Sequence, residues 1–188
     1  MTTTPISPSA PNAPVALRPA TPVDIPAIQR IYAHHVLHGF ASFEEVPPDA
    51  AELTRRWNAI VEAGLPYICA VDGAAGTVLG YAYAGPYRPR SAYRFCVEDS
   101  IYLAPEATGR GIGRALLERL IERCTEIGKR QMVAVIGDSA NHASIALHRA
   151  CGFRAVGTFA AIGFKHGRWV DSVLMQRPLG AGDASLPL

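Results

Sequence analysis

The chain has 188 residues, of which 49% are hydrophobic and 18% are charged, and its formal net charge is +2. This length fits one domain with a single core, and the composition excludes wholesale disorder. The basic residues are dispersed apart from the group Arg88, Arg90 and Arg94. A nucleic-acid-binding protein is therefore excluded, because it needs a larger cluster of basic residues.

The cysteines Cys69, Cys96, Cys124 and Cys151 lie far apart and form no C-x-x-C pair. This spacing argues against a zinc ribbon or a thioredoxin-like motif, and the apolar neighbours suit buried free thiols in a reducing compartment. The N-terminal stretch lacks the basic and apolar regions of a secretory signal, and no apolar run reaches membrane-spanning length. We expect a cytoplasmic protein with no membrane partner.

The first half of the chain begins with a Ser-, Thr-, Pro- and Ala-rich segment, residues 1–14, which we expect to be disordered. A strand, two helices and a two-strand hairpin are then predicted at 15–20, 21–39, 49–64, 67–72 and 77–85. Thr21 is the expected N-cap of the first helix and Pro22 its first residue, while Gly64 ends the second helix.

The second half alternates strands and helices. A long strand over 93–105 stops at Pro105 and is followed by the most regular amphipathic helix of the chain. The predicted elements are helix 111–129, strand 131–137, helix 141–152, and strands 154–164 and 168–176.

The resulting order, β-α-α-β-β-β-α-β-α-β-β, predicts a mixed sheet flanked by helices, of the α/β or α+β class. We expect one domain over residues 15–178, followed by a loose C-terminal tail over 179–188.

Three glycines, Gly109, Gly111 and Gly113, precede the amphipathic helix directly. They do not form a P-loop, because the only Gly-Lys pair of the chain is followed by Arg130. They do not form a Rossmann fingerprint either, because counting six residues from Gly109 or from Gly111 does not end on a glycine. A flexible turn that binds no ligand is one interpretation. The alternative is a turn whose amides, together with the helix N-terminus and Arg110 and Arg114, bind a pyrophosphate.

The segment Thr108-Gly109-Arg110-Gly111-Ile112-Gly113 resembles the acetyl-CoA motif [QR]-x-x-G-x-[GA] of the GNAT N-acetyltransferases, with Thr at the first polar position. Three further blocks, at 81–103, 133–153 and 163–172, resemble the phosphinothricin/methionine sulfoximine acetyltransferase branch of that superfamily. The similarity runs from Leu17 to Pro178. It implies a GNAT-like, mostly antiparallel sheet and a homodimer.

The resemblance implies acetyl-CoA as co-substrate. Asn141 and Ser144 open a helix and could simply be helix caps. The coenzyme site that the resemblance implies consists of Ile101, Tyr102, Leu103, Gly109, Arg110, Gly111, Ile112, Gly113, Arg114, Asn141 and Ser144.

Strand alternation places Glu98, Ser100 and Tyr102 on one face and Asp99 on the other. These polar residues could simply face solvent. The resemblance implies that Glu98 is the general base, and that the backbone of residues 101–103 binds the pantetheine arm and polarises the acetyl carbonyl. His148 could be a surface histidine at a helix C-terminus. The resemblance gives it a catalytic or coenzyme-contacting role.

The resemblance also implies an acceptor site. Arg90 is suited to bind a substrate carboxylate, although an isolated arginine is more often a surface residue. His166 and Trp169 are expected to border this pocket. The predicted acceptor residues are Phe43, Arg90, Tyr93, Ser100 and Ala134.

A metal site is not predicted. His34 and His38 share a helix face, and His35 lies between them, but no H-E-x-x-H pattern accompanies them. The expected activity is direct transfer of acetyl, in a ternary complex, to the α-amine of phosphinothricin, methionine sulfoximine or methionine sulfone. Two alternatives stay open: another small amine or a protein N-terminus as acceptor, or an acyl-CoA-binding sensor without catalysis.

Overall fold

The computed structural model describes residues 14–73 and 76–187. The predicted disordered segment, 1–14, falls outside the described residues except for Pro14. The order of helices and strands confirms the prediction. The elements are β1 (Val15–Pro19), α1 (Ile25–His38), α2 (Ala50–Glu62), β2 (Tyr67–Asp72), β3 (Val78–Pro86), β4 (Cys96–Leu103), α3 (Ile112–Glu126), β5 (Gln131–Gly137), α4 (His142–Ala150), β6 (Arg154–Lys165) and β7 (Arg168–Pro178).

The first helix begins later than predicted, because a 3-10 turn over Pro22–Asp24 precedes it. Thr21 caps this turn, and the carboxylate of Asp24 accepts hydrogen bonds from the Thr21 amide at 2.8 Å and its hydroxyl at 2.9 Å. Arg18 donates to both oxygens of Asp24 at 2.7 Å. The Arg18 hydrogen bond lowers the pKa of Asp24 to about 2, although burial opposes it. The charged pair fixes where α1 starts.

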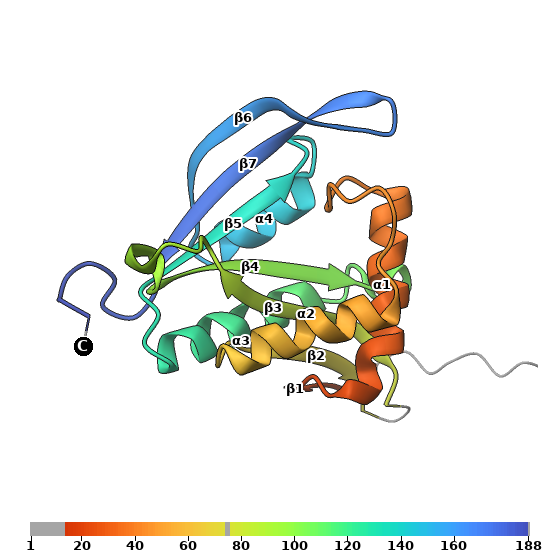
Figure 1. Cartoon of the computed structure of the whole chain (residues 1–188), viewed down its shortest axis with the longest axis horizontal. Coiled ribbons are helices and arrows are strands. Elements are labelled where there is room, and N and C mark those ends of the chain that lie inside the picture. The colour runs from red at the N-terminus through yellow and green to blue at the C-terminus, as the bar shows by residue number, and fades with distance from the viewer. Residues whose placement is uncertain (1–13, 74–75, 188) are drawn as a thin grey trace, which may run out of the picture.

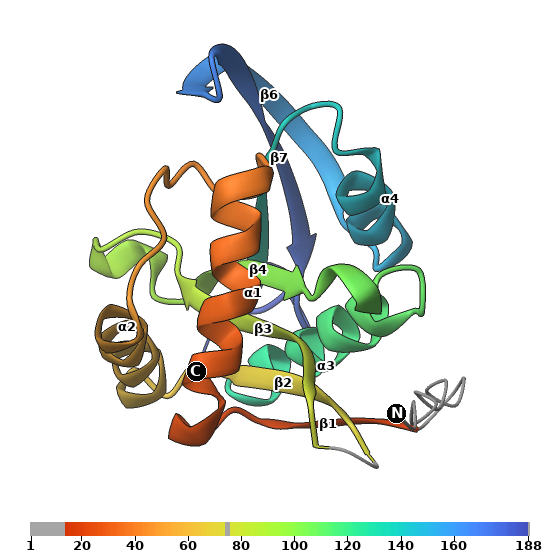
Figure 2. The ribbon, with the colours of Figure 1, turned by 90° about the vertical axis from the view of Figure 1, so that its right-hand side faces the viewer.

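The seven strands of the described residues form one sheet in the order β1-β2-β3-β4-β5-β7-β6. All neighbouring strands are antiparallel except β4 and β5. Helices α1 and α2 cover one face of the sheet, and α3 covers the other (Figure 2). This arrangement confirms the predicted mixed, mostly antiparallel sheet.

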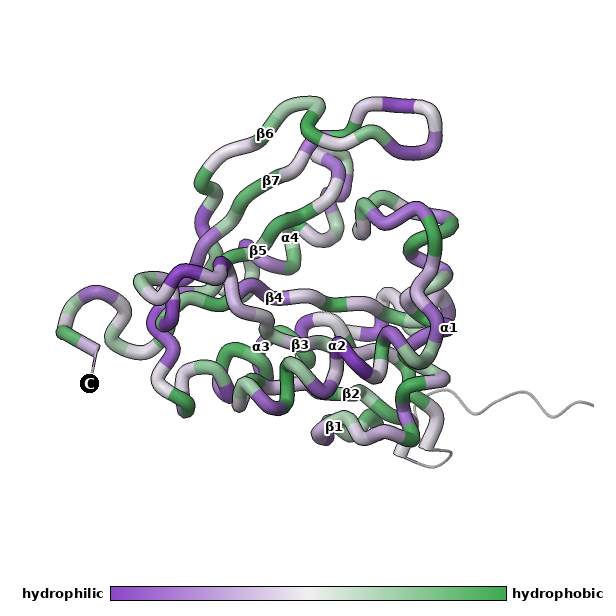
Figure 3. The backbone as a smooth tube through the Cα atoms, in the orientation of Figure 1, coloured by the Kyte–Doolittle hydropathy of each residue, from purple (hydrophilic) through white to green (hydrophobic). Residues whose placement is uncertain are grey.

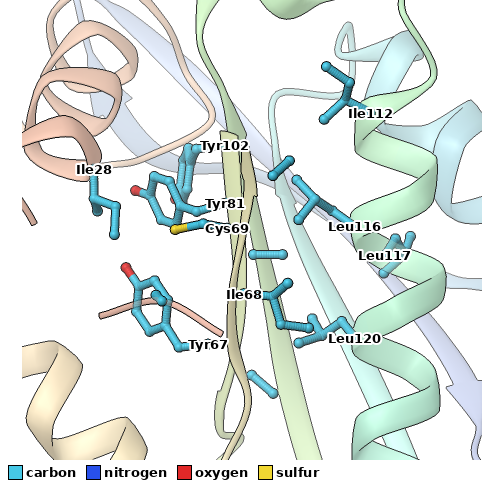
Figure 4. Packing of buried hydrophobic residues seen from close by; sticks show 14 of the residues in the cluster. Ile28, Tyr67, Ile68, Cys69, Tyr81, Tyr102, Ile112, Leu116, Leu117 and Leu120 are labelled. Atoms are coloured by element: carbon cyan, nitrogen blue, oxygen red, sulfur yellow. The ribbon is translucent and has the colours of Figure 1, made fainter. Parts of the chain in front are cut away.

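The core lies on both faces of the central strands. Ile28 of α1 packs on the face that carries Tyr67 and Tyr81, whereas Leu116 and Leu120 of α3 pack on the opposite face (Figure 4). The tube coloured by hydropathy shows apolar residues gathered on these strands and a hydrophilic stretch at the tip of the β6–β7 hairpin (Figure 3).

Strands β4 and β5 run side by side for only a short distance. Their register pairs Cys96 with Gln131, Val97 with Met132 and Glu98 with Val133, and it then stops. β4 continues along β3 to Leu103, while β5 continues along β7 to Gly137. The two halves of the sheet therefore diverge after Glu98 (Figure 1). We call the gap between them the split.

The C-terminal segment, predicted as a loose tail, contacts the domain. Leu179 is buried, and its amide donates to the Arg130 carbonyl at 2.9 Å. The Arg130 side chain in turn donates to Ser185 at 3.2 Å. None of the helices in the described part of the chain is both long and apolar enough to cross a membrane.

Candidate active site

Strand β4 carries its two neighbouring carboxylates to opposite faces of the sheet. The ring of Tyr102 lies 5.0 Å from the Tyr32 ring of α1, which marks the face that Glu98 and Ser100 share. On the other face, Asp99 Oδ2 lies 3.0 Å from His148 Nε2 of α4. The alternation predicted from the sequence therefore holds along this strand.

The backbone of β4 presents polar groups to the split. The amide of Ala104 donates to Leu79 O at 2.9 Å, which fixes the phase of the ladder with β3. Because successive residues of an antiparallel strand direct their hydrogen-bonding groups to opposite sides, those of Asp99, Ile101 and Leu103 point toward the split. An extended ligand with amide groups could therefore pair with β4 where β5 has moved away.

His35 of α1 contacts the last residue of β4, and sequence analysis gave it no role in the active site. Its Nε2 lies 2.7 Å from the carbonyl oxygen of Leu103, and its ring lies 5.4 Å from that of Tyr102. Burial lowers the pKa of His35, which favours the neutral ring with the proton on Nε2. The neutral histidine thus donates to Leu103 and anchors the end of β4.

Glu98 lies at the last position where β4 and β5 still pair. It is half-buried, and its partner on β3 is Gly85, which has no side chain to fill the space beside the carboxylate. Burial raises the pKa of Glu98, and the nearby charge of Asp99 raises it further. A carboxylate with a raised pKa is a stronger base than an ordinary glutamate, which suits proton abstraction.

His148 is buried, and each of its ring nitrogens has a partner. Nδ1 donates to the Ser144 carbonyl at 2.8 Å, and Nε2 lies 3.0 Å from Asp99 Oδ2. Burial alone would lower the pKa of His148, but the hydrogen bond and charge of Asp99 outweigh it and raise the pKa. Asp99 Oδ1 is also buried and has no partner among the described residues. The sequence predicted neither the pair nor the burial, because only the fold places α4 over Asp99.

The glycine-rich turn has the conformation expected of an anion-binding turn. Gly109 and Gly111 have φ angles of 72° and 77°, which side chains disfavour. The first bond of α3 runs from the Ala115 amide to the Gly111 carbonyl at 3.1 Å. The amides of residues 112–114 are therefore left without helical partners at the positive end of the helix dipole.

The remaining predicted coenzyme residues lie in this turn, in the first turn of α3 and at the start of α4. A Cβ on Gly113 would lie in ordinary contact with Leu147 at 3.4 Å and Leu103 at 3.6 Å, so the start of α3 lies beside α4 and the end of β4. Arg110 is exposed, whereas Arg114 is paired with Glu118 at 2.8 Å. Asn141 is the N-cap of α4, where its side chain accepts from the Ser144 amide at 3.2 Å. Of these residues, Gly113 is the one whose contacts with Leu147 and Leu103 place it beside α4 and the end of β4.

The predicted acceptor residues lie in three places. Ser100 and Ala134 flank the split, one on β4 and one just beyond the last paired residue of β5. Arg90 and Tyr93 lie in the exposed loop between β3 and β4, where Arg90 forms no ion pair with any described residue. Phe43 lies in the loop between α1 and α2, and it packs against the β6–β7 hairpin.

A polar network that sequence analysis did not identify holds the α1–α2 loop. Tyr32 Oη lies 2.8 Å from Ser42 Oγ and donates to Glu44 at 3.0 Å, and Arg56 binds Glu44 at 2.6 Å. Burial raises the pKa of Tyr32 to about 12. These residues come from two helices and a loop, and they follow no motif by which the sequence could have shown the network.

The histidines of α1 do not form a larger cluster of metal ligands. The rings of His34 and His38 lie 4.9 Å apart on the exposed face of the helix. Within residues 14–73 and 76–187, no group of three or more His, Cys, Asp and Glu side chains is arranged to hold a metal ion.

Comparison with known proteins gives consistent results. Residues 29–153 match the model of the Acetyltransferase (GNAT) family. The chain is 58% identical, over 87% of its length and 82% of the relative's, to phosphinothricin N-acetyltransferase from Alcaligenes faecalis. It is 42% identical, over 86% and 92%, to L-methionine sulfoximine/L-methionine sulfone acetyltransferase from Pseudomonas paraeruginosa. A crystal structure of a Sinorhizobium meliloti phosphinothricin acetyltransferase in complex with AcCoA superposes with a TM-score of 0.90, at 54% identity and 93% coverage of each chain.

The buried pair of His148 and Asp99 predicts a pH-dependent stability. Because the pKa of His148 is raised above the unfolded value of 6.5, the stabilisation is complete below pH 6.5 and is lost as the pH rises through the folded pKa. The change Asp99→Asn should lower the pKa of His148, and it should lower the free energy of unfolding by about 3 kcal/mol in the acidic range. NMR titration and urea unfolding at several pH values measure both. A wild-type pKa at or below 6.5 would contradict this account.

Proposed function

The chain belongs to the GNAT acetyltransferase family, and we propose that it transfers acetyl from acetyl-CoA to the α-amine of a small amino-acid analogue. The acceptors in this proposal are phosphinothricin, methionine sulfoximine and methionine sulfone, which are the substrates in the names of its relatives. The observation that carries the proposal is the half-buried carboxylate of Glu98, with its raised pKa, at the point where β4 leaves β5.

The residues at the split fit acetyl-CoA. Amides of residues 112–114, together with Gly109 and Gly111 in their left-handed conformation, would hold the pyrophosphate. The backbone of Asp99 and Ile101 would pair with the amides of the pantetheine arm. Acetyl-CoA supplies an activated acetyl thioester, and the β4 amides that face the split would polarise its carbonyl.

Glu98 would accept the proton of the acceptor amine. The facing residue of β3 is a glycine, so no side chain from β3 covers the carboxylate, and burial keeps the carboxylate poorly solvated. Arg90 has a guanidinium without an ion pair among the described residues, which suits it to bind an acceptor carboxylate with Tyr93 beside it. Asp99 is less suited as the base, because His148 already binds it on the opposite face.

Direct transfer, without an acyl-enzyme intermediate, agrees with the state of the cysteines. The thiols of Cys69, Cys124 and Cys151 are free and buried. Burial also raises the pKa of the half-buried Cys96 and of Cys151, and it raises the pKa of Cys69 and Cys124 to about 12, which disfavours the thiolate that a nucleophile needs. The free thiols also support the cytoplasmic location that the proposal includes.

We extend the proposal to a homodimer formed through β6. This edge strand is exposed along nearly its whole length, and large apolar side chains project from the hairpin: Val156, Phe159, Ile162, Phe164 and Trp169. An exposed edge strand with a contiguous apolar surface is typical of an interface with another protein chain. Sedimentation equilibrium should give twice the 20.1 kDa mass of one chain. The mass of a single chain would refute the dimer.

The change Glu98→Gln tests the assignment of the base. It should lower kcat by a factor of about 100 or more while the Kd for acetyl-CoA stays unchanged, because only proton transfer is lost. The wild-type rate should fall on the acid side with an apparent pKa above the ordinary 4.5, since the pKa of Glu98 is raised, and the variant should lose this limb. Steady-state kinetics at several pH values measure kcat and its apparent pKa, and calorimetry measures the Kd for acetyl-CoA. The exposed Glu62→Gln is the control, and an unchanged rate in Glu98→Gln would remove Glu98 from the mechanism.

The change Gly111→Ala tests the turn. Its φ of 77° disfavours a side chain, so alanine should displace the amides and raise the Kd for acetyl-CoA about tenfold. Gly128→Ala is a matched control, because Gly128 has a φ of 78° and, like Gly111, has open space where a Cβ would lie. Both variants should lose similar stability, but only Gly111→Ala should weaken binding in calorimetry. Equal binding by the two variants would show that the turn does not hold the coenzyme.

A further inference from the structure

A buried lysine joins the hairpin to the α1–α2 loop. Lys165, the last residue of β6, is 1% exposed, and its Nζ donates to the carbonyl oxygen of Ser42 at 2.6 Å. Burial lowers the pKa of Lys165, although the carboxylates of Glu45 and Glu44 oppose this. Lysine is almost never fully buried unless it is paired. Its bond therefore indicates a role in holding the β6–β7 hairpin against the α1–α2 loop.

Around this bond the loop and the hairpin are in direct contact, and we call residues 40–44 together with 163–168 the junction. A Cβ on Gly163 would lie 2.4 Å from the ring of Phe43, so this ring packs directly on the hairpin backbone. The guanidinium of Arg168 lies 3.9 Å above the ring of Phe40. The junction is therefore packed by backbone and rings, with Lys165 as its buried charged donor.

A bulge in β6 directs the hairpin toward the loop. Phe159 pairs with Ser172 and Gly163 with Val170, so residues 160–162 face Asp171 alone. Asp171 holds the bulge by accepting from the Ala161 amide at 2.9 Å and from Ser139 Oγ at 2.6 Å. Bulges bend strands. The hairpin tip consequently leans over the end of α1 and the loop that follows it (Figure 1, Figure 2).

The same loop is tied to the catalytic face of β4. Ser42 Oγ lies 2.8 Å from Tyr32 Oη, and the Tyr32 ring contacts that of Tyr102, which shares a face with Glu98. Ser42 is therefore held on two sides, its hydroxyl by Tyr32 of α1 and its carbonyl by Lys165 of the hairpin. Phe43 follows directly, between these two contacts and Gly163.

We propose that Lys165 is a positioning residue for the acceptor: by holding the Ser42 carbonyl, it fixes Phe43 against Gly163 and so sets the size of the acceptor pocket. The inference rests on the proposed function and on the prediction, implied by the resemblance, that Phe43 is one of the acceptor residues. The side chain of Lys165 does not touch the acceptor. It acts through the loop, so its loss changes acceptor affinity and selectivity and leaves coenzyme binding as it was.

The variant Lys165→Met keeps an unbranched side chain of similar length and removes the donor. It should raise the KM for the acceptor about tenfold, reduce the discrimination between small and larger amino-acid acceptors, and leave kcat and the KM for acetyl-CoA within about twofold. The control is Arg119→Met, the same kind of loss of a charged donor at an exposed position of α3, where Arg119 pairs with Glu122 at 3.0 Å outside the junction and the proposed site. This control should behave as wild type.

Gly163→Ala provides a second test that leaves Lys165 intact. Its added Cβ should displace Phe43 and give the same selective rise in acceptor KM. Hydrogen exchange of the amides of residues 40–46, measured without any acceptor, should be faster in Lys165→Met than in wild type.

Three results would overturn the inference: unchanged exchange in the loop, faster exchange with an unchanged acceptor KM, or an equal loss of acceptor and acetyl-CoA affinity. A wild-type protein that acetylates no amine would refute the proposed function. The exchange measurement would still decide whether Lys165 holds the loop.

Discussion

The divergence of β4 and β5 after Glu98 is the constraint on which the rest of the structure depends. Two parallel strands that separate leave backbone hydrogen-bonding groups without partners, and these groups must be satisfied by water, side chains or a ligand. Here His35 binds the last carbonyl of β4, and the groups of Asp99 and Ile101 remain directed into the split. The glycine-rich turn opens at the same end of β4. The fold thus leaves an extended backbone edge that leads from the proposed anion-binding turn to the proposed base.

Neighbouring carboxylates on one strand acquire different properties because they face different surroundings. Glu98 is half-buried beside a glycine and has a raised pKa, which makes it fit to exchange a proton. Asp99 points to the other face and shares a buried hydrogen bond with His148. The pair contributes to the packing of α4 against β4, and its charge raises the pKa of Glu98 further. Asp99, which bonds to His148, therefore also raises the pKa of Glu98, the proposed general base.

The sequence was sufficient for features set by local spacing. Alternation placed Glu98 and Asp99 on opposite faces of β4, and the glycines of the turn marked the start of α3. It was insufficient where distant segments meet. The bond between Lys165 and Ser42 joins residues 123 positions apart, and the His148–Asp99 pair spans 49. The 3-10 turn before α1 depends on Arg18, which the capping pattern at Thr21 could not show. The β6 bulge requires Asp171 from the facing strand.

The central claim is acetyl transfer to the amine of a small amino-acid analogue. The most direct test is release of free thiol from acetyl-CoA by the purified protein, with phosphinothricin, methionine sulfoximine, ordinary amino acids and a peptide amine each offered separately. The account predicts strong turnover that is selective for the first two. Turnover on the peptide alone would contradict the assigned acceptor while keeping the chemistry. Tight binding of acetyl-CoA with no thiol release on any amine would contradict the enzyme itself.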